Sequence, residues 1–165
     1  MITIVPYNTQ WPIAFAEEAN LVSVALGSNC IAIHHIGSTA VPGLKSKPII
    51  DILAEVRELH RIDQATGSMK TLGYRVRKES GFPARRLFQK GQDTKTHNLH
   101  IYQEGNPEIE KCLKFRDWMR THPKDATMYA QLKEALAIYS KDIVEYCNGK
   151  ATFIASILAK SDLPT

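Results

Sequence analysis

The residues with the clearest chemical meaning in this sequence are two small residues that follow one predicted strand and one acidic residue inside the next predicted strand. Gly37 and Ser38 follow the apolar run 31–36, and Asp51 lies inside a second apolar run, 48–53. Glycine lets backbone N–H groups approach an anion because it lacks the Cβ that would block them. A carboxylate among apolar neighbours needs a cation or hydrogen-bond donors beside it. The pattern therefore predicts a phosphate-binding turn next to a metal-binding acid.

Further hydroxyl and basic groups extend the candidate phosphate site. The candidate phosphate-binding residues are Gly37, Ser38, Thr39, Lys47 and Arg116. Arg86 is a candidate catalytic contact to a substrate anion, because a guanidinium group forms paired hydrogen bonds with phosphate. Arg85 and Arg86 are adjacent on a predicted strand and point to opposite faces, so only one of them can enter a cleft. The alternative is that Gly37-Ser38 is an ordinary turn between strands.

Asp51 is the candidate ligand for Mg²⁺, and it is a catalytic candidate together with His100. Mg²⁺ prefers carboxylate, water and phosphate oxygens as ligands. A two-metal site normally brings two or three carboxylates together. The next residue on the same strand face is Leu53, and Glu55 lies one step further along. The alternative is that Asp51 is a structural carboxylate satisfied by hydrogen bonds.

Three histidines and one asparagine are further pocket candidates. Strand alternation predicts Asn98 and His100 on one face and His97 on the other. If the first pair faces Asp51, His100 can act as a metal ligand, a base or a phosphate contact. A transition-metal centre is a second possibility, and its ligands would be His35, Asp51 and His100.

The elements that must position these residues follow from apolar periodicity and turn signals. Strands are expected over 2–5, 31–36, 48–53, 74–78, 84–90 and 96–102, with turns at Gly81, Pro83 and Gly91. Helices are expected over 11–26, 57–72, 106–120, from 123 onward and over 151–160, and the pattern leaves open whether the fourth helix runs through 142–146. This order predicts an α+β fold in one domain, 1–165, with a mixed β-sheet flanked by helices and a C-terminal helical section.

The bulk properties narrow the class of ligand only slightly. The net charge of +4 and the sequence pI near 9.0 suit an anionic ligand, but no specific nucleic-acid signature is present. The three cysteines form no CxxC pair, so we expect them to be reduced thiols. Residues 1–12 lack the features of a signal peptide, and together with the reduced thiols this favours a cytoplasmic location. No apolar stretch approaches the ~18 residues that a membrane helix needs. The sequence does not indicate an oligomeric state.

The motifs together resemble the GrpB family, which is also found fused to dephospho-CoA kinase. The resemblance runs nearly end to end, and its most specific blocks are 35–44 (HIGSTAVPGL), 47–52 (KPIIDI) and 97–101 (HNLHI). It implies a nucleotidyltransferase-like fold, in which a Gly-Ser turn binds nucleotide phosphates and strand carboxylates bind Mg²⁺. Gly37, Ser38 and Asp51 fall on that motif.

Three functional hypotheses follow. The first is a nucleotidyltransferase-like protein that binds a nucleotide or another phosphorylated small molecule and transfers a nucleotidyl or phosphoryl group with Mg²⁺. The second is a non-catalytic ligand-binding or partner domain that lacks the full set of carboxylates. The third is a hydrolase with a His/Asp transition-metal centre.

Overall fold

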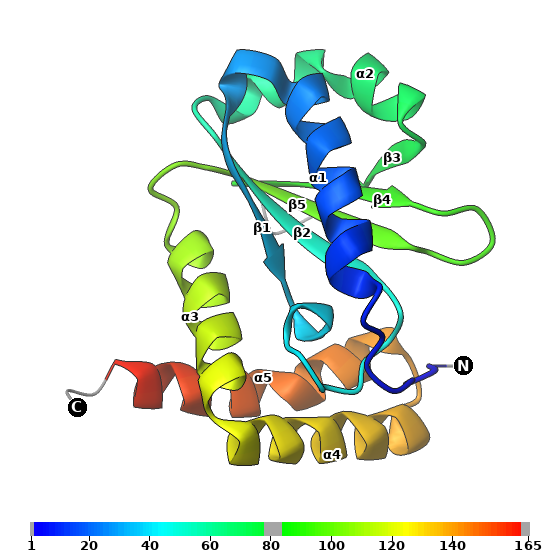
Figure 1. Cartoon of the computed structure of the whole chain (residues 1–165), viewed down its shortest axis with the longest axis vertical. Coiled ribbons are helices and arrows are strands. Elements are labelled where there is room, and N and C mark those ends of the chain that lie inside the picture. The colour runs from blue at the N-terminus through cyan, green and yellow to red at the C-terminus, as the bar shows by residue number, and fades with distance from the viewer. Residues whose placement is uncertain (1, 78–83, 163–165) are drawn as a thin grey trace.

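A mixed five-stranded sheet forms the centre of the computed structural model, which describes residues 2–77 and 84–162 (Figure 1). The strands are β1 (Cys30–Ile36), β2 (Ile50–Val56), β3 (Tyr74–Arg77), β4 (Arg85–Lys90) and β5 (His97–Gln103). Their order across the sheet is β1-β2-β5-β4-β3. The β2–β5 pair is parallel and the other pairs are antiparallel. The predicted α+β fold with a mixed sheet is confirmed.

The helices divide into two groups around this sheet. They are α1 (Trp11–Leu26), α2 (Thr66–Thr71), α3 (Pro107–Thr121), α4 (Pro123–Tyr139) and α5 (Ile143–Ser161). The main core joins α1 and α2 to one face of the sheet, through residues such as Val22, Met69 and Ile52. The other three helices gather at the end where β1 stops and β2 starts (Figure 1). They form the predicted C-terminal helical section.

Helix α3 covers part of the opposite face of the sheet. Ile109 of α3 packs with Leu53 and Tyr102 in a separate apolar cluster, and Leu53 is fully buried there. The first turn of α3 is capped by Asn106, whose side chain accepts a hydrogen bond from the backbone N–H of Glu108 at 2.9 Å. That cap and Pro107 begin the helix where the sequence predicted it.

Several predicted boundaries were wrong. Residues 2–5 form only an isolated bridge between Val5 and Ser46 instead of a strand. The predicted helix 57–72 is a 3₁₀ helix, Leu59–Gln64, followed by the short α2. The second strand begins at Ile50, two residues after the predicted start, and continues to Val56. The turn expected at Gly81 and Pro83 lies outside the described residues.

Helix α5 begins eight residues before its predicted start. Asp142 caps it by accepting a hydrogen bond from the N–H of Glu145 at 2.8 Å. Gly149, which disfavours an interior helical position, lies where α4 packs against α5. A Cβ there would be 2.4 Å from a methyl carbon of Leu136, so glycine allows the two helices to approach closely. Within the described ranges, no helix is long and apolar enough to cross a membrane.

Candidate functional site

The glycine turn and the strand acid lie against each other. Strands β1 and β2 pair so that Ile36 is opposite Asp51, and the chain turns at the next residue, Gly37. Gly37 has φ of 71° and ψ of −172°, a conformation that is essentially restricted to glycine. A Cβ at this position would lie 2.7 Å from Asp51 Oδ2. Only glycine therefore fits beside the carboxylate.

Asp51 is held by two donors from the neighbouring parallel strand. Its Oδ1 atom lies 3.3 Å from Asn98 Nδ2 and 3.4 Å from His100 Nε2. Asn98 and His100 share the face of Asp51, as strand alternation predicted. The amide of Asn98 is oriented by Gln89, which donates a 3.0 Å hydrogen bond to Asn98 Oδ1. Both donors are thus fixed in place by the sheet.

Arg85 determines which nitrogen of His100 carries the proton. Arg85 Nη1 lies 3.2 Å from His100 Nδ1. A guanidinium group can only donate, so Nδ1 must accept. The Nε2 atom of a neutral His100 then carries the hydrogen that it donates to Asp51. The order Arg85, His100, Asp51 is therefore a directed chain of hydrogen bonds.

The Asp51 carboxylate remains ionised at neutral pH. Burial works to raise its pKa, but the hydrogen bonds from His100 and Asn98 and the positive charge of Lys47 outweigh burial and lower the pKa. About a third of the side chain, 31%, is exposed. An ionised carboxylate that solvent can reach thus lies beside the glycine turn.

The side chain of His35 contacts the turn and holds it in position. The turn forms a short 3₁₀ helix, Ser38–Ala40, and the buried Thr39 Oγ1 lies 2.9 Å from His35 Nε2. The His35 ring stacks on Phe15 with 4.7 Å between ring centroids. Burial, together with the charge of Arg120, lowers the pKa of His35 to about 4. His35 and Thr39, both predicted site residues, are engaged in holding the turn.

Two arginines of α3 hold the ends of the same turn. Arg116 Nη1 donates a 3.2 Å hydrogen bond to the carbonyl oxygen of His35, before the turn. Arg120 Nε donates a 2.8 Å hydrogen bond to the carbonyl oxygen of Ala40, at its end. Arg116, a predicted phosphate contact, also pairs with Asp117 at 2.9 Å. Both arginines thus bind backbone carbonyl groups at the two ends of the turn.

Three lysines from separate segments meet near Asp51 and Ser38. Lys47 precedes β2, Lys133 lies on α4 and Lys150 lies on α5. The Nζ atoms of Lys47 and Lys150 lie 5.0 and 4.6 Å from the centroid of the Tyr146 ring. Lys133 is only 2% exposed and donates a hydrogen bond to the carbonyl oxygen of Lys45. The cluster of Lys47, Lys133 and Lys150 is called the lysine cluster below.

Burial and mutual repulsion both act on the lysine cluster. Burial, followed by the charges of Lys150 and Lys47, lowers the pKa of Lys133 to about 7, while Asp51 acts in the opposite direction. Burial and the charge of Lys47 likewise lower the pKa of Lys150, and Asp51 again opposes the shift. The contacts agree with these shifts: Lys133 bonds the backbone two residues before Lys47, and Lys47 lines the same groove as Asn98, which donates to Asp51. The region is rich in positive charge that the protein only partly neutralises.

Two buried tyrosines connect the lysine cluster to the turn. Tyr129 lies one turn before Lys133 on α4, and Ser38 is close enough to act on the pKa of its hydroxyl. Tyr146 is fully buried, and burial raises its pKa to about 12. The Tyr146 hydroxyl has no hydrogen-bond partner among the residues that the structure describes. A buried hydroxyl without a partner is uncommon and is consistent with a polar ligand nearby.

Two predicted site residues lie on the opposite face of the sheet. Arg86 pairs there with Asp63, with 3.0 Å between Nε and Oδ1. His97 Nε2 lies 3.9 Å from Glu18 Oε2, under α1. The arginine on the Asp51 face is Arg85. The structure therefore brings together Gly37, Ser38, Lys47, Asp51, Asn98 and His100, and not Arg86 or His97.

The sequence analysis missed the residues contributed by the C-terminal helices. Tyr129 and Lys133 share a helix face at a spacing of four, which was the only local signal for this side of the site. Tyr146 and Lys150 show the same spacing on α5. Lysine and tyrosine four residues apart are common on helices, so the pattern alone does not indicate a site.

The donor set does not fit a pair of magnesium ions. Among the described residues, Asp51 is the one carboxylate found at the turn, and Leu53 is buried under α3 where a second would stand. Glu55 Oε2 lies 2.5 Å from His34 Nε2, further along the strand. Across residues 2–77 and 84–162, no group of three or more His, Cys, Asp or Glu side chains is suited to a metal ion. The His35–Asp51–His100 centre does not fit either, because His35 is bound to Thr39.

A groove of about 640 Å³ begins beside the site. Lys47, Gln89 and Asn98 line one side of it, and the turn between α4 and α5, with Ser140 and Ile143, lines the other. Its volume is in the range of pockets that hold small molecules. The groove therefore offers room next to the lysine cluster for the rest of a ligand.

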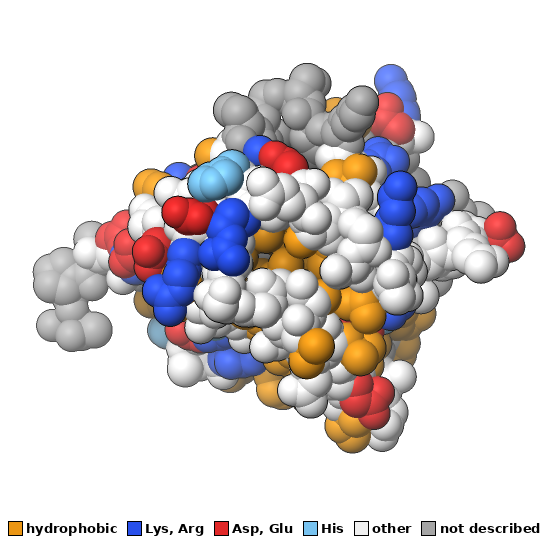
Figure 2. Space-filling model, turned by 90° about the horizontal axis from the view of Figure 1, so that it is seen from above, with side chains coloured by type: hydrophobic (Ala, Val, Ile, Leu, Met, Phe, Trp, Pro, Cys, Tyr) orange, Lys and Arg blue, Asp and Glu red, His pale blue; other side chains and the backbone are white. Residues whose placement is uncertain are grey.

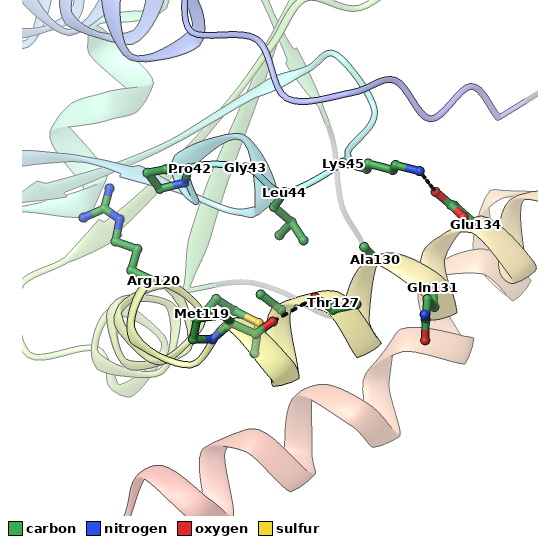
Figure 3. Close-up of a pocket in the computed structure, with 12 residues that line it drawn as sticks. Pro42, Gly43, Leu44, Lys45, Met119, Arg120, Thr127, Ala130, Gln131 and Glu134 are labelled. Carbon is green, nitrogen blue, oxygen red and sulfur yellow. Dashed lines mark hydrogen bonds and ion pairs between the residues drawn. The ribbon is translucent and has the colours of Figure 1, made fainter.

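A second pocket lies on the other side of the loop 42–45 (Figure 3). It has a volume of about 450 Å³ and lies between that loop and helices α3 and α4. Lys45 points toward α4 and pairs with Glu134 at 2.8 Å, while Arg120 lies at the opposite side of the pocket (Figure 3). Neither Gly37 nor Asp51 lines it, so it is separate from the candidate site.

The surface seen from the end that carries α2 does not form one basic region. In Figure 2, Lys and Arg side chains lie in separate groups, and Asp and Glu side chains lie beside several of them. The described side chains visible in this view thus do not form the continuous basic surface that nucleic-acid backbones require.

Comparison with known proteins identifies relatives over nearly the whole chain. A family model described as GrpB protein matches residues 1–160. The UPF0157 protein YqkA of Bacillus subtilis is 44% identical over 154 residues, which cover 93% of this chain and 45% of YqkA. A dephospho-CoA kinase of Mycolicibacterium paratuberculosis is 26% identical over 159 residues, which cover 81% of this chain and 39% of the kinase. The chain thus spans less than half the length of these two relatives.

Solved structures show the same fold. The crystal structure of conserved protein GrpB from Enterococcus faecalis has a TM-score of 0.90, 37% identity and 96% coverage of both chains. Terminal uridylyl transferase 4 from Trypanosoma brucei with bound dUTP has a TM-score of 0.56 and 10% identity, covering 96% of this chain and 56% of that one. At this identity the second likeness shows the fold alone, which is nucleotidyltransferase-like.

Proposed function

The chain belongs to the GrpB family, and we propose that it binds a nucleotide or another phosphorylated small molecule between the Gly37–Ser38 turn and the lysine cluster. The turn would offer backbone N–H groups and the Ser38 hydroxyl to phosphate oxygens. The groove beside Lys47 and Asn98 would receive the remainder of the ligand. A cytoplasmic location, which the free thiols of the chain favour, belongs to the same proposal.

The convergence of Lys47, Lys133 and Lys150 beside one carboxylate is the observation that supports this proposal. Bringing ammonium groups together in a partly buried region is unfavourable, because each loses water and repels the others. A phosphate group would relieve that repulsion and accept hydrogen bonds from the same groups. The unpartnered hydroxyl of Tyr146 lies beside two of these lysines and favours the same location.

Magnesium-dependent nucleotidyl or phosphoryl transfer, the other expectation from the sequence, is not part of this proposal. The site supplies one carboxylate where such chemistry uses two or three. The donor set thus favours the alternative of a ligand-binding protein without the full carboxylate set. Transfer activity stays a prediction, which a search for product formation with nucleoside triphosphates would check.

Calorimetric titration with phosphate, pyrophosphate and nucleoside mono-, di- and triphosphates tests the proposed binding. We expect at least one of these ligands to bind, with an affinity that falls as the salt concentration rises. Lys150→Met should weaken that binding by about tenfold or more, since it removes a charge-assisted contact. Lys124→Met, on the exposed face of α4, is the matched control and should change nothing. Failure of the whole panel to bind would contradict the proposal.

A further inference from the structure

The balance of charge around Asp51 is the reverse of that in a magnesium site. Carboxylates that converge on two Mg²⁺ ions make such a site strongly negative before the metals bind. Here Asp51 is hydrogen-bonded to Asn98, which lines the same groove as Lys47, and Lys47 and Lys150 both lie over the ring of Tyr146. The protein itself therefore supplies the positive charge that phosphate groups need.

The Oδ1 atom of Asp51 and the side-chain carbonyl oxygen of Asn98 already have hydrogen-bond donors. Asp51 Oδ1 accepts hydrogen bonds from Asn98 and His100, and Oδ2 lies against Gly37. The carbonyl oxygen of the Asn98 side chain accepts a hydrogen bond from Gln89. A divalent cation at Oδ1 would have to displace these donors, and Lys47 would repel a cation at either oxygen. This arrangement disfavours a cation beside Asp51.

The lysine cluster lies where a phosphate chain leaving the turn would pass. Lys133 Nζ lies 4.9 Å from the centroid of the Tyr129 ring and donates a hydrogen bond to the carbonyl oxygen of Lys45, two residues before Lys47. Lys47 and Lys150 lie around the ring of Tyr146, and Lys47 also lines the groove. The three ammonium groups come from the loop before β2, from α4 and from α5, so they surround the region instead of lining one side.

We infer that this site binds its phosphate-bearing anion without a divalent cation, and that Lys47, Lys133 and Lys150 take the neutralising role that magnesium ions have in nucleotidyl transfer. The inference rests on the proposed function, because it describes how the same pocket holds its ligand. Mg²⁺ in solution then competes with the lysines for the phosphate oxygens. Binding should accordingly be no tighter with magnesium than without it.

Titration of the protein with inorganic pyrophosphate, in EDTA and again in excess Mg²⁺, tests the inference. We expect binding in EDTA that is equal to or tighter than binding with Mg²⁺. Binding that occurs only with Mg²⁺ overturns this inference and leaves the proposed function standing. No binding in either buffer, for pyrophosphate and for the nucleotide panel alike, overturns the proposed function and this inference with it.

Asp51→Asn makes the test sharper because the two accounts predict opposite results. If lysines alone neutralise the anion, removing the negative charge of Asp51 should tighten pyrophosphate binding in EDTA several-fold. If a metal held by Asp51 were required, the same substitution would abolish binding. Asn98 and His100 can still donate to the asparagine oxygen, and a thermal melt would verify folding.

Lys47→Met provides a second variant on the exposed side of the groove. It should weaken pyrophosphate binding in EDTA by about tenfold or more. Lys124→Met is again the control. An unchanged affinity in Lys47→Met and in Lys150→Met would overturn the inference, whatever Asp51→Asn shows.

Discussion

Gly37 is the residue on which the geometry of the site depends most directly. Gly37→Ala places a Cβ 2.7 Å from Asp51 Oδ2 in a backbone conformation that alanine avoids. We expect a loss of about 3 kcal/mol in the free energy of unfolding, from strain and from displacement of the carboxylate. Gly43→Ala is the control, since Gly43 has φ of 82° but open space around it. That control should lose only about 1 kcal/mol. Equal losses in urea denaturation of the two variants would contradict the close contact.

Lys133 makes stability depend on pH in a predictable direction. Its folded-state pKa is about 7, below its usual 10.5. Below pH 7 both the folded and the unfolded chain hold the proton, so the full penalty of burying the charge is present. Above pH 7 the folded chain releases the proton while the unfolded chain keeps it, so the free energy of unfolding rises with pH.

Lys133→Met should remove this pH dependence. The difference in unfolding free energy between wild type and variant is expected to move in favour of wild type by about 1–2 kcal/mol from roughly pH 7 to pH 9. Urea denaturation across that range measures it, and Lys124→Met should show no such trend. A difference that stays constant with pH would contradict the shifted pKa.

At the scale of elements, α3 holds the Gly37–Ser38 turn in place through side chains that bind the backbone at its ends. Arg120→Met removes the hydrogen bond to the carbonyl oxygen of Ala40. We expect about 1–2 kcal/mol lower stability and several-fold weaker pyrophosphate binding, because the turn loses its anchor. Lys111→Met changes the exposed side of the same helix and should affect neither. A normal affinity in Arg120→Met would show that the turn keeps its shape without α3.

The sequence predicted the half of the site that lies on the sheet. Local alternation was enough to place Asn98 and His100 on one face, because a strand repeats every two residues. Alternation could not tell which of Arg85 and Arg86 shares the face of Asp51, since that depends on the register between β4 and β5. Helix α5 was predicted too short because Gly149 weakens a helix locally, whereas its contact with Leu136 arises only in the folded chain.

The other half of the site forms only when segments that are distant in the sequence pack together. Lys47, Lys133 and Lys150 are widely separated in the sequence, and nothing local distinguishes a clustered lysine from one in solvent. Only the packing of α4 and α5 against the end of the sheet brings them together (Figure 1). The packing of α3 on the sheet likewise explains why residue 53 is an apolar leucine, since α3 covers the position where a second carboxylate would lie.

A crystal structure of the protein grown with pyrophosphate and EDTA tests the central claim most directly. The account predicts pyrophosphate between the Gly37–Ser38 turn and the ammonium groups of Lys47, Lys133 and Lys150. Pyrophosphate bound instead in the pocket beside Arg120 and Lys45, with the lysine cluster unchanged, would contradict it.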